Sequence, residues 1–139
     1  MCLMDWHKLL REKLIILMQY ATDWRKSIRM PLHTIEMTDY AERDLENLGD
    51  YIAFKLYNPV AAERIVHGIR HRINELKKFP LKYKLDEDVV LADLGVRRTN
   101  FDNYDIFYFI DESILTVYII RILHSLTDYR SHLYQIINI

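Results

Sequence analysis

Two long amphipathic helices with almost no loop between them are the strongest constraint on how this chain folds. Thr38 or Asp39 can cap the first helix. Its apolar residues recur at intervals of three or four, and they are Ala41, Leu45, Leu48, Ile52 and Leu56. Asn58-Pro59 ends this helix and begins the next, because asparagine caps a helix and proline tolerates the first helical position. The second stripe, Ala62, Ile65, Ile69, Ile73 and Leu76, runs to Phe79-Pro80. A helical hairpin is therefore predicted.

Extended segments are predicted on both sides of this hairpin. Before it, His33, Ile35 and Met37 alternate with Thr34 and Glu36, which is the period of a short strand. After it come four runs rich in β-branched and aromatic residues, at 89–92, 96–101, 104–110 and 114–123. The short breaks between these runs indicate antiparallel hairpins. We expect an α+β domain made of an N-terminal strand, the helical hairpin and an antiparallel β-meander, with the helices on one sheet face and the other face available for function.

Residues 1–29 form a separate predicted element. Their apolar side chains have the spacing of one amphipathic helix, at Trp6, Leu10, Leu14, Leu17, Ala21, Trp24 and Ile28. Pro31 ends that helix, because its ring removes a donor and constrains Met30. The helix can pack on the main domain, contact a partner, or precede the natural start at Met30. We expect an N-terminal extension over residues 1–29 and one folded domain over 30–139.

The composition is that of one soluble domain. Of its 139 residues, 50% are hydrophobic and 28% are charged. No run reaches the roughly 18 apolar residues that a membrane span requires, and the single cysteine, Cys2, fits a reducing cytoplasm. A formal net charge of -1 gives no global attraction to nucleic acid. Basic residues nevertheless gather between Arg64 and Lys84, ahead of acidic residues between Asp86 and Asp93, a pattern that also fits a solvated helix face.

The last predicted strand and the residues after it carry the candidate functional side chains. The run VYIIRILHSLTDYR, residues 117–130, contains Arg121, His124, Asp128 and Tyr129. An arginine inside a strand is costly unless it is paired or used, and an imidazole and a phenol can serve acid/base chemistry or polar docking. Structural roles compete with these functions. Arg121 can pair with Asp105 or Asp111 across the sheet, His124 can cap the turn, and Asp128 can cap a terminal helix.

The order of these segments resembles the RelE/ParE superfamily of toxins from bacterial type II toxin-antitoxin modules. The resemblance covers roughly residues 31–133. It rests on YAERDLENLGDYI, on NPVAAERIVHGIRHRINELKKFP, on Arg97-Arg98 ahead of NYDIFYFID, and on VYIIRILHSLTDYRSHL. It implies a small antiparallel sheet with two N-terminal helices, and a cognate antitoxin that covers the open sheet face with a helix and an extended segment.

The resemblance implies two different activities. RelE-like toxins cleave mRNA in the ribosomal A site, whereas ParE-like toxins poison DNA gyrase and have no hydrolytic site. Metal-free cleavage by the 2′-hydroxyl requires a proton acceptor, a donor for the leaving 5′ oxygen, and cations over the phosphate. Arg97, Arg98 and Arg121 can supply the cations, and His124 and Tyr129 the proton transfer. A metal is not expected: His67 and His71 have the spacing of two ligands, but no third ligand completes the site.

Two departures from the RelE-like pattern favour the ParE-like activity. RelE-like nucleases carry lysines on the strand leading into the meander, where this chain has Val-Val-Leu-Ala at 89–92. They also carry an arginine after the tyrosine of the next strand, where Tyr104 is followed here by Asp105, a carboxylate that would repel a phosphate. We expect a toxin without a cofactor that binds a macromolecular target such as gyrase. The expected contact residues are Arg97, Arg98, Arg121, His124, Asp128 and Tyr129. A ribosome-dependent endoribonuclease using Arg97, Arg121, His124 and Tyr129, and an inactive family member, are the alternatives.

Overall fold

The computed structural model describes residues 10–14 and 32–137. The chain divides into two compact units, Met1–Pro31 and Leu32–Ile139, and each is described by itself. In the first unit, residues 10–14 are helical, and the side chains of Leu10 and Leu14 are exposed. The other apolar positions of the helix predicted over residues 1–29 lie outside the described residues.

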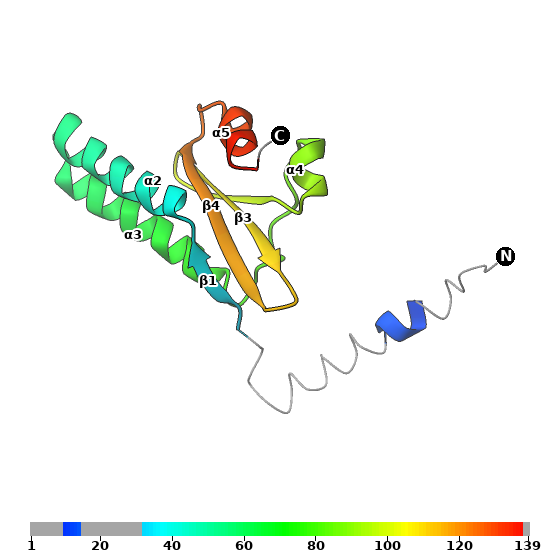
Figure 1. Cartoon of the computed structure of the whole chain (residues 1–139). Coiled ribbons are helices and arrows are strands. Elements are labelled where there is room, and N and C mark those ends of the chain that lie inside the picture. The colour runs from blue at the N-terminus through cyan, green and yellow to red at the C-terminus, as the bar shows by residue number, and fades with distance from the viewer. Residues whose placement is uncertain (1–9, 15–31, 138–139) are drawn as a thin grey trace. The chain divides into compact units, whose positions relative to one another are not determined.

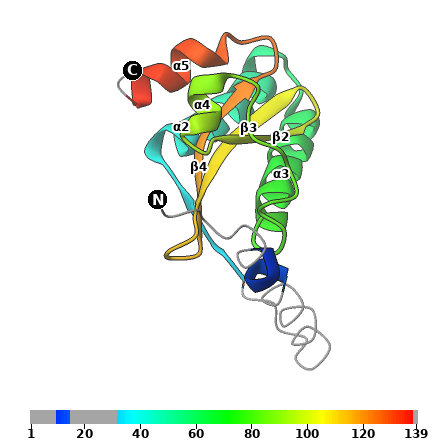
Figure 2. The same cartoon turned by 90° about the vertical axis from the view of Figure 1, so that its right-hand side faces the viewer.

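Four strands of the second unit form one mixed sheet (Figures 1 and 2). The strand order is β1-β4-β3-β2. Neighbours β2-β3 and β3-β4 are antiparallel, whereas β1 runs parallel to β4. The elements follow the chain as β1 (Thr34–Met37), α2 (Asp39–Asp50), the π-helical turn η1 (Tyr51–Lys55), α3 (Pro59–Glu75), α4 (Val89–Asp93), β2 (Arg97–Phe101), β3 (Tyr104–Asp111), β4 (Thr116–His124) and α5 (Tyr129–Ile136). The α+β class, the N-terminal strand, the helical hairpin and the β-meander are confirmed.

The predicted caps set the beginning of both long helices. The Thr38 side chain accepts a hydrogen bond from the Ala41 N–H at 3.1 Å and donates one to the Ile120 carbonyl at 2.8 Å. It therefore begins α2 and joins that helix to β4. Asn58 accepts from the Ala61 N–H at 3.1 Å, with Pro59 at the first position of α3. That helix ends at Glu75, ahead of the predicted stop at Phe79-Pro80.

The hairpin of α2 and α3 packs on one face of the sheet (Figure 1). All five predicted positions of the second stripe are buried there, and so are four of the first stripe. Leu56 is the exception, because 55% of its surface is exposed. The wider π-helical turn η1 precedes it, and a π-turn rotates the residues that follow out of phase with an α-helical stripe.

The second face of the sheet is covered as well, which corrects the expectation that it is open. Helices α4 and α5 bury a second core there, formed by Leu91, Val96, Phe107, Ile120, Leu123 and Leu133. The strand predicted at 89–92 is also wrong, since these residues form α4. The Asp88 carboxylate accepts from the Leu91 N–H at 3.2 Å, and this cap, with full burial of Leu91, prevails over the strand preference of two valines. None of the helices in the described part of the chain is long and apolar enough to cross a membrane.

Candidate functional site

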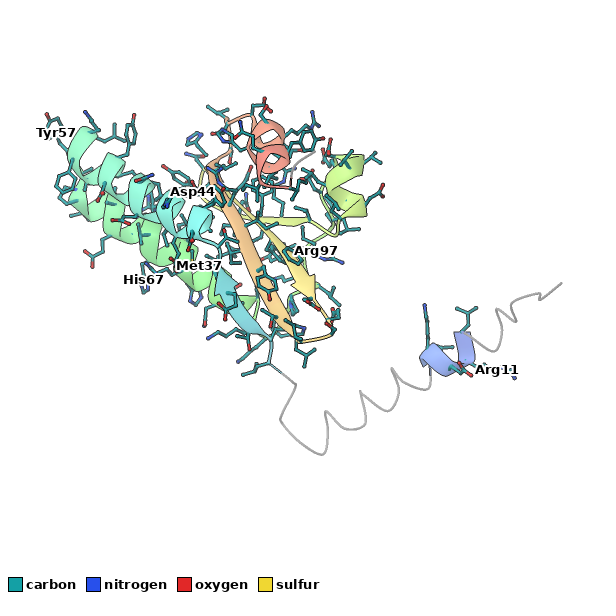
Figure 3. The ribbon with its side chains drawn as sticks, viewed as in Figure 1. Arg11, Met37, Asp44, Tyr57, His67 and Arg97 are labelled. Carbon is teal, nitrogen blue, oxygen red and sulfur yellow. The ribbon has the colours of Figure 1, made fainter. Side chains whose placement is uncertain are left out.

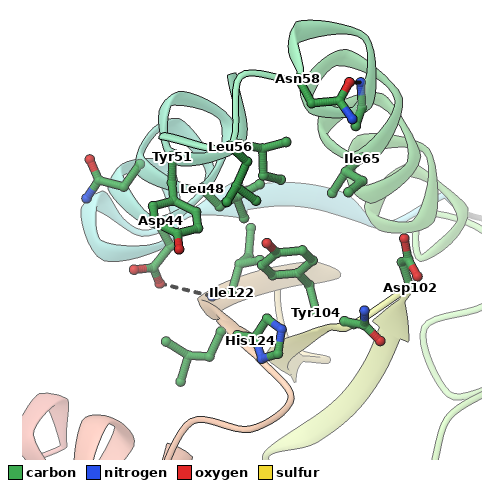
Figure 4. Close-up of a pocket in the computed structure, with 15 residues that line it drawn as sticks. Asp44, Leu48, Tyr51, Leu56, Asn58, Ile65, Asp102, Tyr104, Ile122 and His124 are labelled. Carbon is green, nitrogen blue, oxygen red and sulfur yellow. Dashed lines mark hydrogen bonds between the residues drawn. The ribbon is translucent and has the colours of Figure 1, made fainter. Parts of the chain in front are cut away.

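Arg121 is held by an aspartate of α2 rather than by either predicted partner on the sheet. Its Nε lies 2.6 Å and its Nη2 2.9 Å from the two carboxylate oxygens of Asp44. Asp44 also accepts from the Ile122 N–H at 3.0 Å, the bond dashed in Figure 4. Each of the two charged side chains is only 14% exposed. The expected pairs with Asp105 or Asp111 are therefore wrong, although a structural ion pair is present.

Strand β4 contains a register shift beside Arg121. Phe107 of β3 pairs with Arg121, but the next residue, Tyr108, pairs with Ile119, so that Ile120 is an extra residue in β4. A bulge of this kind changes the direction of the side chains that follow it. Val117 and Ile119 lie in the core under the helical hairpin, whereas Leu123, which simple alternation would place with them, lies in the second core.

A groove of about 800 Å³ opens beside the Arg121–Asp44 pair. It lies between the helical hairpin and the adjacent ends of β3 and β4, and Figure 4 shows its lining. Apolar side chains that include Leu48, Ile52, Ile65 and Ile122 contribute to it, together with the polar side chains of Asp44, Tyr51, Asp102, Tyr104 and His124. Its lining contains two aspartates, but Asp44 is paired with Arg121 and Asp102 lies 3.4 Å from Arg64, so the groove is mainly apolar.

His124 lies in this groove at the end of β4. Its ring meets that of Tyr104 edge-on, with centroids 5.4 Å apart and an interplanar angle of 83°. Its Nδ1 accepts a hydrogen bond from the Leu126 N–H at 3.2 Å, so this nitrogen stabilises the turn after β4, as one of the sequence interpretations predicted. Burial, with the charge of Asp102, raises the pKa of the Tyr104 phenol.

An exposed apolar surface continues from the groove to the tip of the helical hairpin. Large apolar side chains with more than half of their surface exposed gather there: Tyr51, Phe54, Leu56, Tyr57 and Val60. Figure 3 shows Tyr57 at the end of the hairpin. Contiguous exposed apolar surface of this kind marks an interaction site. Sequence reasoning missed it because Leu56 was assigned to the core.

Arg98 and Tyr129 belong to a different cluster, centred on the buried carboxylate of Asp86. The Tyr129 hydroxyl donates to Asp86 at 3.1 Å, and the Asp88 N–H does so at 2.9 Å. Arg98 lies 3.6 Å from Asp86 and 3.7 Å from Asp105, with its guanidinium 5.0 Å from the centre of the Tyr129 ring. Burial, followed by the charge of Asp86, raises the pKa of Tyr129. These contacts attach the beginning of α5 to the sheet.

Further contacts of α5 converge on Asp88. The Tyr134 hydroxyl donates to this carboxylate at 2.7 Å, and Arg130 lies 3.3 Å from it. The bond from Tyr134 holds the pKa of Asp88 below its usual value. Asp128 occupies the predicted cap position of α5, but its side chain accepts from the Ser131 hydroxyl at 2.6 Å and forms no hydrogen bond to a backbone N–H of the first turn.

Arg97 lies on β2, at an edge of the sheet (Figure 3). Its Nη1 donates to the Tyr83 carbonyl at 2.7 Å. Arg72 of α3 donates to the hydroxyl of the same tyrosine at 2.9 Å. Arg97 therefore fastens the segment between α3 and α4 to the edge strand.

Comparison with known proteins assigns the chain to a family. A model of the family described as the ParE toxin of the type II toxin-antitoxin system, parDE, matches residues 35–129. The chain belongs to this family of toxins. None of the curated proteins compared with it gives a match.

Solved structures of related systems share the fold of this ParE-family chain. A chain of the RelBE2 toxin-antitoxin complex from Mycobacterium tuberculosis is 24% identical, with 69% of this chain and 94% of that chain covered and a TM-score of 0.52. A chain of the chromosomal ParDE system from P. aeruginosa is 18% identical, with 68% of this chain and 98% of that chain covered and a TM-score of 0.56. A mutant of the E. coli toxin RelE in the free state is 12% identical, with 76% of this chain and 98% of that chain covered and a TM-score of 0.53.

The predicted functional residues of this ParE-family chain do not converge on one site. Arg121 and His124 lie beside the groove under the helical hairpin, whereas Arg98 and Tyr129 lie on the face covered by α5. Among residues 10–14 and 32–137, no cluster of three His, Cys, Asp or Glu side chains could hold a metal ion. Sequence reasoning missed the two carboxylates that organise these clusters, Asp44 and Asp86. Asp44 lies next to Leu45 of the apolar stripe, which is the signal that could have placed it near the core.

Proposed function

We propose that this toxin inhibits growth by binding DNA gyrase without cleaving RNA, and that a cognate antitoxin neutralises it. The supporting observation is that the three candidate arginines, the Tyr129 hydroxyl and Nδ1 of His124 already have partners within the protein. Three arginines were the candidate phosphate ligands. Arg121 is paired with Asp44, Arg98 with Asp86 and Asp105, and Arg97 with the Tyr83 carbonyl.

Recruiting these arginines to a scissile phosphate would carry a large free-energy cost. Moving Arg121 to RNA would leave the Asp44 carboxylate without its cation, although that carboxylate is 14% exposed. Moving Arg98 would do the same to Asp86, whose side chain is fully buried. Leaving one charge of a buried pair uncompensated costs about 3–5 kcal/mol. A phosphate held by these side chains would have to recover that cost before any stabilisation of the transition state.

The proton-transfer candidates are engaged in the same way. The Tyr129 hydroxyl donates a hydrogen bond to Asp86, and burial raises the pKa of this phenol, so little phenolate is present to act as a base. His124 uses Nδ1 to accept from the Leu126 N–H, which leaves only Nε2 for a substrate. The two side chains also lie in different clusters of the fold. The acid and the base of a cleavage reaction must both reach one phosphodiester. The separation of His124 from Tyr129 disfavours such a joint contact.

The end of β4 is the surface that we assign to target binding. His124, Leu126 and Asp128 are all exposed, and Leu126 has 90% of its surface accessible. An exposed leucine flanked by polar side chains suits a protein interface, where one apolar residue enters a pocket of the partner. Of the residues predicted from sequence, His124 and Asp128 remain proposed contacts with the target. We assign Arg98 and Arg121 a structural role, because each forms ion pairs within the fold.

The antitoxin is proposed to bind in the groove beside the helical hairpin. Because α4 and α5 already cover the second sheet face, we assign an apolar partner segment to the groove and the apolar hairpin tip. An amphipathic helix laid into an apolar groove is a common mode of recognition.

The proposal is tested by expressing the full chain under tight induction and following DNA and protein synthesis in one culture. We expect replication to stop first, and we expect the purified chain to inhibit DNA supercoiling by gyrase. Leu126→Asp should relieve both the block in replication and the inhibition of gyrase. The matched control Ile114→Asp, which changes an exposed isoleucine in the turn between β3 and β4, should relieve neither. An immediate stop in translation with mRNA cut at codon boundaries would instead support the RelE-like alternative. Unimpaired growth would support the inactive one.

A further inference from the structure

The connection between α3 and α4 contains a basic segment, residues 77–84, that none of the sites above uses. Its sequence is Lys-Lys-Phe-Pro-Leu-Lys-Tyr-Lys. Tyr83 packs against the main core, and its hydroxyl accepts from Arg72. Lys82 and Lys84 on either side of it are exposed, as expected where side chains alternate along an extended chain. The fold therefore presents lysines outward from a backbone that Tyr83 anchors.

The charge of this basic segment is almost unopposed. Within the described residues, Lys77, Lys78 and Lys82 form no ion pair, and Lys84 lies 3.9 Å from Glu87 in a pair whose members are both largely exposed. Such exposed pairs contribute little and separate easily. In contrast, the arginines at 98, 121 and 130 are all paired with carboxylates. The free positive charge of this part of the molecule therefore gathers at residues 77–84.

Two internal arginines strengthen the positive potential behind this segment. Arg72 donates to the Tyr83 hydroxyl and Arg97 to the Tyr83 carbonyl, and neither forms an ion pair among the described residues. Burial raises the pKa of the Tyr83 phenol, but hydrogen bonding with Thr99 and then with Arg72, together with the charges of Arg72 and Lys82, brings it below its usual value. Arg72 and Lys82 thus place positive charge around the Tyr83 hydroxyl.

We propose that the basic segment 77–84 binds the phosphate backbone of duplex DNA without reading its sequence. The inference rests on the proposed function for its choice of DNA over other polyanions, because a toxin bound to gyrase lies beside the DNA that gyrase holds. Lysines suit this contact, since an ammonium group is a compact point charge without the planar fork by which arginine recognises bases. Lys78, Lys82 and Lys84 are the phosphate ligands.

Counterion release sets the size of the expected effect. Each phosphate neutralised on duplex DNA contributes about 0.9 to the slope of log K against log salt concentration. Three lysines then account for a slope of about 2.7. Removing them should flatten the salt dependence by that slope, so that between 50 and 200 mM salt the wild type loses about fortyfold more affinity than the variant does.

The test measures binding of the purified full chain to a labelled DNA duplex by fluorescence anisotropy over a series of salt concentrations. The triple variant Lys78→Gln, Lys82→Gln, Lys84→Gln is compared with a control that loses three exposed positive charges elsewhere: Arg43→Gln, Lys55→Gln, Arg70→Gln. Both triple variants have the same net charge. We expect the first to lose affinity and slope, the control to retain both, and the triple Lys→Arg variant at 78, 82 and 84 to bind as the wild type does.

The outcomes that would overturn the inference are distinct from failure of the proposed function. An equal loss in both triple variants would show an effect of net charge alone, and tighter binding to RNA than to duplex DNA would overturn the assignment to DNA. A lower melting temperature of the Lys→Gln variant, with no rescue by Lys→Arg, would make the segment structural. Because this assay contains no gyrase, a translational block in the growth experiment would refute the proposed function and leave the measured DNA affinity standing.

Discussion

Replacing Asp44 with alanine tests whether Arg121 has a structural role. The change removes the acceptor of three hydrogen bonds, two from the guanidinium and one from the Ile122 N–H, in a pair whose members are each 14% exposed. Breaking a buried pair from one side costs about 3–5 kcal/mol, and some access to water places this pair at the lower end, near 3 kcal/mol. For a domain of this size, that loss lowers the melting temperature by about 12 °C.

A double-mutant cycle measured by denaturant unfolding separates this pair from its surroundings. Asp44→Ala and Arg121→Met should each be strongly destabilising, and the double variant should be less destabilised than the sum by about 2 kcal/mol, since neither charge is left alone. Asp50→Ala, at an exposed aspartate of the same helix, is the control and should change stability by less than about 0.5 kcal/mol. If Arg121→Met unfolds like the wild type yet abolishes toxicity, Arg121 contacts the target and the structural assignment is refuted.

Three further predictions concern other elements. Gly68→Ala should lower the free energy of unfolding by about 1–3 kcal/mol despite the better helix propensity of alanine, because its Cβ would overlap the Phe101 ring; calorimetry should show recovery with Phe101→Leu. Asn58→Ala should cost about 1 kcal/mol in denaturant unfolding through loss of the α3 cap. The pKa of Asp88 is lowered in the folded state, so its contribution is present above its unfolded pKa and is lost as the pH falls through the folded value. An NMR titration should show the Asp88 carboxyl titrating at higher pH in Tyr134→Phe, and an unchanged titration would exclude the Tyr134 bond as the cause.

The helical hairpin was predictable because its signals are local. Asn58-Pro59 and Thr38 act within one turn of the helices that they begin, and the two apolar stripes need only an opposing surface to be buried. The strands of the β-meander follow in the same way from alternation and short turns. Even so, Leu56 could not be placed, since the π-helical turn before it depends on how the two helices meet.

The short helix α4 was not predictable from its own residues. Val89 and Val90 favour a strand in isolation. The Asp88 cap is a local signal, but what stabilises α4 is the burial of Leu91 against Phe107 and Leu133, which come from β3 and α5. A five-residue helix forms too few internal hydrogen bonds to be stable alone. Tertiary burial therefore decided its structure.

By itself, the sequence determined the fold class, the order of the elements and the residues that carry chemistry, because caps, periodicity and turns act over a few residues. Only the tertiary structure decided what those chemical residues do. Arg121 meets Asp44 across 77 residues of sequence, and Tyr129 meets Asp86 across 43. Nothing in the local pattern specifies such a pairing, since it depends on how α2 and α5 pack against the sheet. The free energy of a buried arginine depends on its partner in space, and only the fold supplies that partner.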